Sequence, residues 1–292
     1  MRKCPLCGGS AGNPAFPHQT YWNNKNYAYM SCPECKTVFV DPIPDDHDFA
    51  LMYSKQNYHD IHYDTLELNN YCHSIKLALP VLKNKNSLLD YGCGNGAFLI
   101  AAKQAGFSCV GVEYEESAKQ NAIQNSGVSV YDFKSLKETG KKFDIIHLGD
   151  VLEHLPNPYE VMVDLQNLLE PEGVFFIEGP LETNPSIVYW AAIYFRRLNQ
   201  VLGKSIPIGT NTPTHLFMTN EQAQKRFFTH RLSYHCLYFT INETGWPYFQ
   251  NKLPMFNWKL PILIKQAIGF FAIVASRLFP KLGNRFLAIF QP

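Results

Sequence analysis

The chain has 292 residues and a formal net charge of +1, and 46% of its residues are hydrophobic and 14% aromatic. This composition supports a packed core and lacks the excess of positive charge that typically binds nucleic acid. We therefore expect a folded protein with one large domain and an appendage, or with two modest domains, and no nucleic-acid partner.

The N-terminal residues MRKCP are not followed by an apolar run and a small-residue cleavage site. A secretory signal is therefore not predicted, and we expect a cytoplasmic location. In the cytosol, paired cysteines are more often metal ligands than disulfides.

Two cysteine pairs lie near the N-terminus, Cys4 with Cys7 and Cys32 with Cys35, with twenty-four residues between the pairs. Two C-x2-C turns can supply four thiolates to one tetrahedral Zn²⁺ and leave no open coordination position. We therefore predict a structural zinc ribbon over residues 1–41. The segment between the two pairs has one lysine and no arginine, so it does not resemble a phosphate-binding surface.

Residues 42–86 follow as a helical bridge or lid. This segment begins with the proline-rich turn DPIPDD and carries several tyrosines and histidines. Tyr53 and Tyr58 are candidates to face a substrate.

From residue 87 the pattern alternates between apolar strands and helices. The expected strands cover residues 87–91, 108–113, 128–131, 143–148 and 173–179, and the expected helices cover residues 97–106, 116–127 and 157–173. Alternation of this kind predicts a parallel sheet with helices on both faces and a ligand site beyond the carboxyl ends of the strands.

The segment LLDYGCGNG joins the first of these strands to a helix, and its glycines let a ligand approach the backbone. Gly92, Gly94 and Ala97 also fit a dinucleotide fingerprint loosely, and Glu113 could hold a ribose diol in either case. Asp90 favours another ligand, because a carboxylate there is unfavourable beside a pyrophosphate and suits a cationic amino group.

These motifs resemble the class I S-adenosylmethionine-dependent methyltransferases. The resemblance rests on LLDYGCGNG, on VGVEY, and on FDIIHLGDVLEHLPNP followed by LLEPEGVFFIEGP, and it covers about residues 87–180. The cysteine pairs resemble a subgroup with a zinc ribbon ahead of the methyltransferase domain, whose members often modify sugars or other small metabolites.

The resemblance implies a Rossmann-like, seven-stranded sheet over residues 87–292 and S-adenosylmethionine as the cofactor. Asp90, Gly92 and Gly94 would surround its methionine end, and Glu113 would hold its ribose hydroxyls. The remaining cofactor-binding candidates are Tyr114, Asp132 and Phe133, which would lie near the adenine, and Asp150.

The segment DVLEHLPNP places Asp150, Glu153 and His154 at i, i+3 and i+4, so on a helical turn they would share one face. His154 could remove a hydroxyl proton, with Glu153 or Asp150 orienting it. The trio could instead hold a divalent cation such as Mg²⁺, because it resembles the acid-x-x-Glu-His arrangement of ubiquinone-pathway O-methyltransferases, with Asp in place of the usual Glu. A third alternative is that these residues only shape the turn.

Residues 181–214 are rich in aromatic side chains and are expected to be an insertion that covers the substrate. Arg196 and Arg197 could meet a phosphate or carboxylate there or be solvated. His215 is a further catalytic candidate ahead of a helix for which Thr219 and Gln222 predict a capping box.

The C-terminal region is expected to hold two antiparallel strands with an apolar helix between them, over residues 260–280. Lys265 and Arg277 bracket only eleven residues, too few to cross a bilayer. The helix could be buried, could contact a membrane peripherally, or could mediate a homodimer of the protein.

We therefore predict an S-adenosylmethionine-dependent methyltransferase that acts on a small molecule, with O-methylation of a sugar or sugar nucleotide as the leading reaction. The alternatives are an NAD-dependent oxidoreductase, against which Asp90 and the Glu153–His154 turn argue, and a non-catalytic zinc-ribbon interaction protein, against which the intact glycine turn and Glu113 argue.

Overall fold

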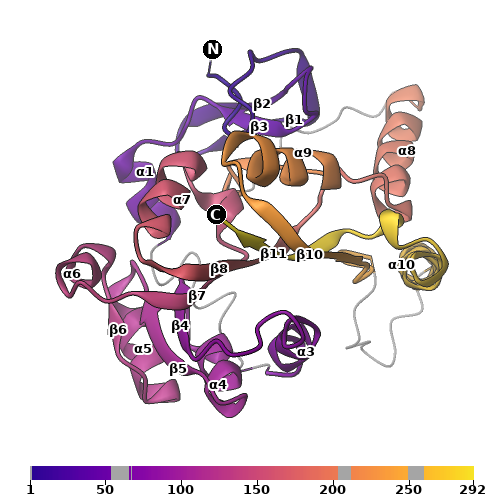
Figure 1. The fold of residues 1–292 in the computed structure, drawn as a ribbon. Helices are drawn as coiled ribbons and strands as arrows, with labels where there is room; N and C mark the ends of the chain where they lie inside the picture. Colours follow the sequence, from indigo (N-terminus) through magenta and orange to yellow (C-terminus); the bar gives the residue numbers. More distant parts are fainter. Residues whose placement is uncertain (1, 54–65, 67, 203–211, 249–259) are drawn as a thin grey trace. The chain divides into compact units, whose positions relative to one another are not determined.

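In a computed structural model, residues 2–53, 66, 68–202, 212–248 and 260–292 are described (Figure 1). The chain divides into two compact units. The ribbon unit consists of Met1–Pro42, Pro180–Phe227 and Thr240–Phe286. The sheet unit consists of Ile43–Gly179, Phe228–Phe239 and Leu287–Pro292. Each unit is thus built from segments far apart in the sequence.

The sheet unit is organised by a seven-stranded sheet in the order β10-β11-β8-β7-β4-β5-β6. Its strands are β4 (Ser87–Tyr91), β5 (Ser108–Val112), β6 (Val130–Tyr131), β7 (Phe143–Gly149), β8 (Leu169–Pro180), β10 (His235–Asn242) and β11 (Arg285–Gln291). Its helices are α1 (Asp46–Met52), α3 (Asn69–Ala78), α4 (Ala97–Gln104), α5 (Glu116–Ser126), α6 (Phe133–Glu138) and α7 (Pro158–Gln166), with the short turns η2 (Leu152–His154) and η3 (Phe227–Arg231).

The central strands are parallel. β4 pairs with β5 on one side and with β7 on the other, and the chain continues outward to β6 and to β8, also in parallel. The strand order therefore reverses at β4, and in open α/β sheets the ligand site lies at this switch point, beyond the carboxyl ends of the strands. The predicted seven-stranded α/β sheet is confirmed.

Both faces of the sheet are covered. Leu88 and Leu89 are consecutive in β4, point to opposite faces, and are both buried. On the Leu88 face the core joins β4, β7, β8 and β11 to α3 and α4 through Ile75, Phe98, Ala102, Ile145, Phe176 and Ile289. Because Leu88 and Leu89 are both buried, each face of the sheet is covered, as the predicted arrangement with helices on both faces requires.

One predicted helix is too long. The helix expected over residues 157–173 ends at Gln166, and β8 already begins at Leu169. Pro171 explains the difference, because a proline disfavours helical backbone at the preceding residue and cannot donate the next helical hydrogen bond. Leu169 instead pairs with Phe143 in the sheet.

The ribbon unit contains a four-stranded sheet in the order β1-β2-β3-β9, formed by β1 (Pro14–Trp22), β2 (Lys25–Ser31), β3 (Val38–Asp41) and β9 (Phe217–Met218). All its pairs are antiparallel, and Tyr27, Tyr29, Val38 and Val40 form its buried cluster. The unit also holds α8 (Ile187–Val201), α9 (Glu221–Arg226), α10 (Leu260–Leu278) and the turn η4 (Pro280–Leu282).

The cap of α9 differs from the prediction. Asn220, rather than Thr219, is the N-cap residue, and its Oδ1 accepts a hydrogen bond of 2.9 Å from the backbone N–H of Ala223. Asn caps helices at least as well as Thr. The Thr219 hydroxyl instead accepts a hydrogen bond of 3.0 Å from the Gln224 side chain.

None of the helices in the described part of the chain is long and apolar enough to span a bilayer.

Candidate active site

The carboxyl end of β4 carries a buried carboxylate, Asp90, which is 2% exposed. The register of β4 and β7 places Asp90 directly beside His147, and Oδ1 of Asp90 lies 2.7 Å from Nδ1 of the imidazole. Among the residues that the structure describes, Oδ2 of Asp90 has no hydrogen-bond partner. One oxygen of this carboxylate is thus held by the protein, and the other remains available to a ligand.

His147 connects Asp90 to a second buried acid. Its Nε2 lies 3.3 Å from Oε1 of Glu178 in β8, and Oε2 of Glu178 accepts a hydrogen bond of 2.6 Å from the Ser74 hydroxyl in α3. The imidazole is stacked on the Phe98 ring with 3.5 Å between the ring centroids. Its orientation is therefore fixed from three sides.

Burial by itself would lower the pKa of His147, but hydrogen bonds and negative charge from Asp90 and Glu178 raise it to about 9. At neutral pH the network is thus an imidazolium between two carboxylates. A buried charge is tolerated when it is paired and hydrogen-bonded in this way.

A cleft opens beside this network. It is lined by Asp90 and His147, by Cys93 and Asn95 of the glycine turn, and by Tyr71 of α3. Gly92 has a φ of +79°, and a Cβ at this position would lie 2.7 Å from Cγ2 of Val151. Position 92 therefore requires glycine both for its backbone conformation and for space.

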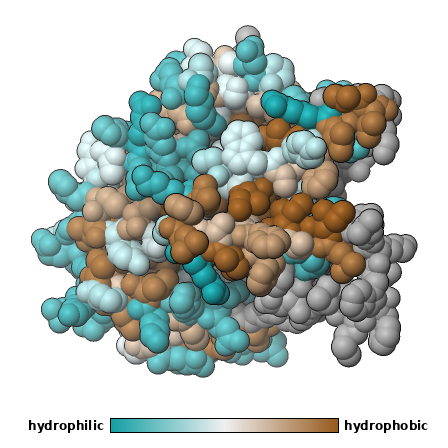
Figure 2. Space-filling model, turned by 90° about the vertical axis from the view of Figure 1, so that its right-hand side faces the viewer, coloured by the Kyte–Doolittle hydropathy of each residue, from teal (hydrophilic) through white to brown (hydrophobic). Residues whose placement is uncertain are grey.

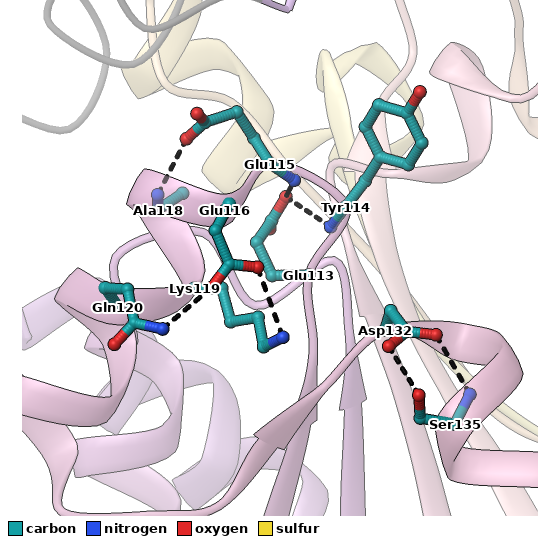
Figure 3. Close-up of polar contacts among 9 residues, drawn as sticks. All are labelled: Glu113, Tyr114, Glu115, Glu116, Ala118, Lys119, Gln120, Asp132 and Ser135. Atoms are coloured by element: carbon teal, nitrogen blue, oxygen red, sulfur yellow. Dashed lines mark hydrogen bonds and ion pairs between the residues drawn. The ribbon is translucent and has the colours of Figure 1, made fainter.

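Glu113 directly follows β5, and backbone N–H groups hold its carboxylate. Oε1 accepts from the amides of Tyr114 at 2.8 Å and Glu115 at 3.1 Å (Figure 3). Oε2 accepts from the amide of Gly94 at 2.8 Å. The two loops that follow β4 and β5 are joined through this one side chain. A carboxylate has about four acceptor sites, so hydroxyl groups can still bind to it.

The three residues predicted to lie near the adenine have different environments. Tyr114 is 83% exposed. Asp132 is the N-cap of α6, and the hydrogen bonds that it accepts from the hydroxyl and amide of Ser135 lower its pKa (Figure 3). The ring of Phe133 meets the ring of Tyr91 edge-on, with 5.2 Å between centroids.

The residues after β7 do not form the predicted helical face. Asp150 has a left-handed backbone with a φ of +52°, and only Leu152–His154 form a short 3-10 turn. The expectation that Asp150, Glu153 and His154 share one face is therefore wrong. The physical reason is that the amide of Asp150 donates to the carbonyl of Glu178 in β8 at 3.0 Å, which holds Asp150 at the sheet rather than in a helix.

His154 contacts a tyrosine far away in sequence. The hydroxyl of Tyr53 lies 3.0 Å from Nδ1 of His154, and Nε2 of His154 lies 4.0 Å from Oε1 of Glu153. Tyr53, at the end of α1, is thus brought to the candidate base by the fold. The other candidate tyrosine, Tyr58, lies outside the described residues.

His215 belongs to the ribbon unit, where its Nδ1 pairs with the carboxylate of Glu182. Arg196 of the same unit donates to the carbonyl of Pro17 at 3.2 Å and lies over the Phe16 ring at 5.1 Å. Arg196 is therefore engaged with the protein.

The four N-terminal cysteines converge, and all their sulfur atoms lie within 4.8 Å of one another. Cys4 and Cys35 are 3.6 Å apart and Cys7 and Cys32 are 3.4 Å apart, measured between sulfurs. A tetrahedron with metal–sulfur bonds of about 2.3 Å has sulfur–sulfur edges of about 3.8 Å, so this donor set fits Zn²⁺.

The sequence patterns did not single out His147, Glu178, Ser74 or Glu182. One signal was present, because His147 interrupts the apolar run formed by Ile145, Ile146 and Leu148. Its partners Asp90 and Glu178 could not be found in this way, because they come from β4 and β8 and depend on the register of the sheet.

A parallel sheet that reverses at β4, a glycine turn, and carboxylates at the ends of two adjacent strands define a cofactor-binding α/β domain. The profile of a family described as "Methyltransferase domain" matches residues 35–228, more than half of the chain. The chain belongs to this family, and the resemblance to class I S-adenosylmethionine-dependent methyltransferases is confirmed.

Two curated relatives are named ubiquinone biosynthesis O-methyltransferase. The one from Haemophilus ducreyi is 33% identical over 102 residues, which are 31% of this chain and 43% of the relative. The one from Pseudomonas paraeruginosa is 30% identical over 135 residues, which are 43% of this chain and 55% of the relative. The chain thus spans about half the length of the curated relatives it matches.

Among solved structures, a SAM dependent methyltransferase from Archaeoglobus fulgidus has a TM-score of 0.47 and 16% identity, covering 85% of this chain and all of that one. The plantazolicin methyltransferase BamL, in complex with triazolic desmethylPZN analog and SAH, has a TM-score of 0.49 and 14% identity, covering 84% of this chain and 94% of that one. At these values the likenesses say nothing about the substrate of this chain.

The cysteine cluster predicts one bound zinc ion. The Cys32→Ser variant should lose zinc and lower the melting temperature, since the turns of the ribbon depend on the metal. Zinc content by atomic emission and thermal unfolding check this. Cys72→Ser, at an exposed cysteine outside the cluster, is the control and should keep both values. Native protein purified without zinc would contradict the prediction.

The raised pKa of His147 predicts a pH-dependent contribution to stability. Because the folded pKa lies above the unfolded value of about 6.5, the stabilisation is complete below about pH 6.5 and is lost as pH rises through about 9. The gap in melting temperature between the wild type and His147→Gln should therefore shrink from pH 6.5 to pH 10. A gap that is constant over this range would show that His147 is not charged in the folded protein.

Proposed function

We propose that this chain catalyses S-adenosylmethionine-dependent methyl transfer to a hydroxyl group of a small molecule. The observation that carries the proposal is that Asp90 lines a cleft at the switch point and that its buried Oδ2 has no hydrogen-bond partner among the described residues. An anion in this position fits the positively charged amino group of the cofactor. Membership of the methyltransferase family supports the same reaction.

The cofactor would be held by the ends of the strands. Asp90, Gly92 and Gly94 would surround its amino-acid end, and Glu113 would accept hydrogen bonds from the ribose hydroxyls. Tyr114, Asp132 and Phe133 would lie around the adenine, and Asp150 would line the site after β7. His147 would act as a positioning residue, because it fixes one oxygen of Asp90 and leaves the other without a hydrogen-bond partner among the described residues.

When bound, the cofactor supplies a methyl group that is already activated on a sulfonium. The protein therefore has to align the acceptor oxygen, exclude water and remove a proton. We propose His154 as the base. Its Nδ1 faces the Tyr53 hydroxyl, so Nε2 would take the proton, and the nearby carboxylate of Glu153 would stabilise the imidazolium that forms.

A second candidate base is His215, which Glu182 orients within the ribbon unit. Binding of Mg²⁺ is the less favoured role for the residues after β7, because Asp150 does not share a helical face with Glu153 and His154. Zn²⁺ at Cys4, Cys7, Cys32 and Cys35 is proposed as structural, since four thiolates leave no open position.

For the acceptor we propose a chemical class rather than a particular compound. The names of the curated relatives support an oxygen nucleophile, and the resemblance of the N-terminus to the zinc-ribbon subgroup favours a sugar or sugar nucleotide. We propose that residues 1–41 form the ribbon domain, residues 42–86 a lid, and residues 87–292 the methyltransferase domain, with residues 181–214 covering the acceptor. Parts of the lid and of this insertion lie outside the described residues.

We also propose a cytoplasmic location, which the eight cysteines without a disulfide support, because reduced thiols persist there. No nucleic-acid partner is proposed. A homodimer stays a prediction from the sequence.

Binding of the demethylated cofactor tests the proposal. Calorimetry should show binding of S-adenosylhomocysteine and none of NAD⁺. Asp90→Asn should weaken this binding about 10- to 100-fold, since it removes a charged hydrogen bond. The control Asp164→Asn changes an exposed acid that pairs with Lys137 and should leave the affinity unchanged. Binding of NAD⁺ in place of S-adenosylhomocysteine would support an oxidoreductase instead.

Turnover separates the candidate bases. S-adenosylhomocysteine release should be measured with a panel of nucleoside diphosphate sugars and phenols as acceptors. His154→Ala should lower kcat about 100-fold or more and leave the affinity for S-adenosylhomocysteine nearly unchanged. Tyr53→Phe should have a smaller effect, because the ring of Tyr53 is kept. A loss confined to His215→Ala would assign the base to the ribbon unit, and binding without turnover on any acceptor would favour the non-catalytic alternative.

A further inference from the structure

The helix α10 is apolar on its outer side. Among the side chains of α10 that the structure describes, the buried positions are the small residues Gly269, Ala272 and Ser276, which lie on one stripe. The large residues point outward, with Phe270 52% exposed and Phe271 63% exposed. This is the reverse of an ordinary surface helix, whose large apolar residues face the core.

The outer row continues along the helix. Its members are large apolar residues that are at least partly exposed and lie along α10 and at the residue that follows it: Leu263, Phe270, Phe271, Val274, Leu278 and Phe279. Ile262 and Ile264 in the first turn are exposed as well. A row of this length is not the scatter of single apolar residues that most surfaces show.

The helix α8, which packs against α10 in the same unit, has the same character. Trp190, Tyr194, Leu198 and Val201 are exposed at intervals of four, four and three residues, so they form one stripe. Figure 2 shows apolar side chains gathered on the face of the molecule that carries these two helices. We call the exposed apolar residues of α8 and α10, with Phe279, the apolar face.

All formal charges on the two helices are positive. They are Arg196 and Arg197 on α8 and Lys265 and Arg277 on α10, and Lys281 follows in η4. Residues 183–220 and 244–292, which contain these helices, include no Asp or Glu at all. The two helices and the segments around them thus carry no acid of their own, although the net charge of the whole chain is only +1.

The charge pattern helps to decide whether a second copy of the chain or an anionic membrane covers the apolar face. A symmetric dimer through the apolar face would bring the same cations of both copies together with no acid on either helix to pair with them. The surface of an anionic bilayer offers phosphate groups to the cations and hydrocarbon to the apolar side chains. Trp and Tyr, as at positions 190 and 194, are also enriched at the membrane interface.

We propose that the apolar face binds the surface of an anionic membrane, with α8 and α10 lying in the plane of the interface. The apolar side chains would enter the boundary between headgroups and hydrocarbon, and Arg197, Lys265 and Arg277 would contact the headgroups. This attachment is distinct from the proposed catalytic function and does not depend on it.

Vesicle flotation of the 292-residue chain tests the proposal. Vesicles of phosphatidylcholine with about 30% phosphatidylglycerol should carry the protein, and vesicles of pure phosphatidylcholine should carry markedly less. The Phe270→Ser/Phe271→Ser variant should bind the anionic vesicles at least about tenfold more weakly. Lys265→Ala/Arg277→Ala should reduce anionic binding about fivefold per cation and barely change binding to neutral vesicles.

A matched control removes two exposed apolar side chains from strands. Tyr21 in β1 and Leu237 in β10 are each 44% exposed, and Tyr21→Ser/Leu237→Ser should float like the wild type. Circular dichroism and the thermal shift with S-adenosylhomocysteine should be unchanged in every variant, which separates loss of attachment from loss of folding. Equal flotation of the Phe variant and the wild type would overturn the proposal. So would a stable dimer in light scattering that dissociates in the Phe variant, since a second copy would then cover the face.

Discussion

The site depends on how the protein keeps a carboxylate buried at the end of β4. An isolated charge in such a place is strongly unfavourable, so it needs a partner of opposite sign. His147 supplies that partner, and it is itself stabilised as a cation by Glu178 and by the stacked ring of Phe98. Because the imidazolium engages only one oxygen of Asp90, the network offsets the cost of burial and still leaves the other oxygen without a hydrogen-bond partner among the described residues.

The second carboxylate of the site is stabilised by a different means. The carboxylate of Glu113 accepts hydrogen bonds from three backbone amides. These bonds tie the loop after β4 to the loop after β5. The glycine turn is therefore held in place by the same residue that is proposed to bind the ribose, so the cofactor-binding loops are ordered before a ligand arrives.

The ribbon unit is organised by other features. Four thiols gather at two tight turns, and β9, from residues 217–218, extends the sheet of the N-terminal ribbon. In α10 small residues face the unit and large ones face outward, so burial of α10 within the chain leaves much of its apolar surface exposed. That surface is the feature of the ribbon unit that a methyltransferase reaction does not explain.

The sequence by itself was sufficient to predict the class of fold, the glycine turn, the strand-end acids Asp90 and Glu113, and the grouping of the cysteines. These features follow from local periodicity and from short motifs, in which the interacting residues are close in the chain. Residue patterns also located most helices and strands, although Pro171 ended one helix earlier than its apolar periodicity predicted.

Only the tertiary structure decided which distant residues meet. The pairing of Asp90 with His147 depends on the parallel register of β4 and β7, and the contact of Tyr53 with His154 joins α1 to the loop after β7. Asp150 has a left-handed backbone and is hydrogen-bonded to β8, and no helical pattern in the sequence could reveal either feature. The exposed side of α10 was likewise undecided in the sequence, because an apolar helix shows which of its faces is buried only once its packing partners are in place.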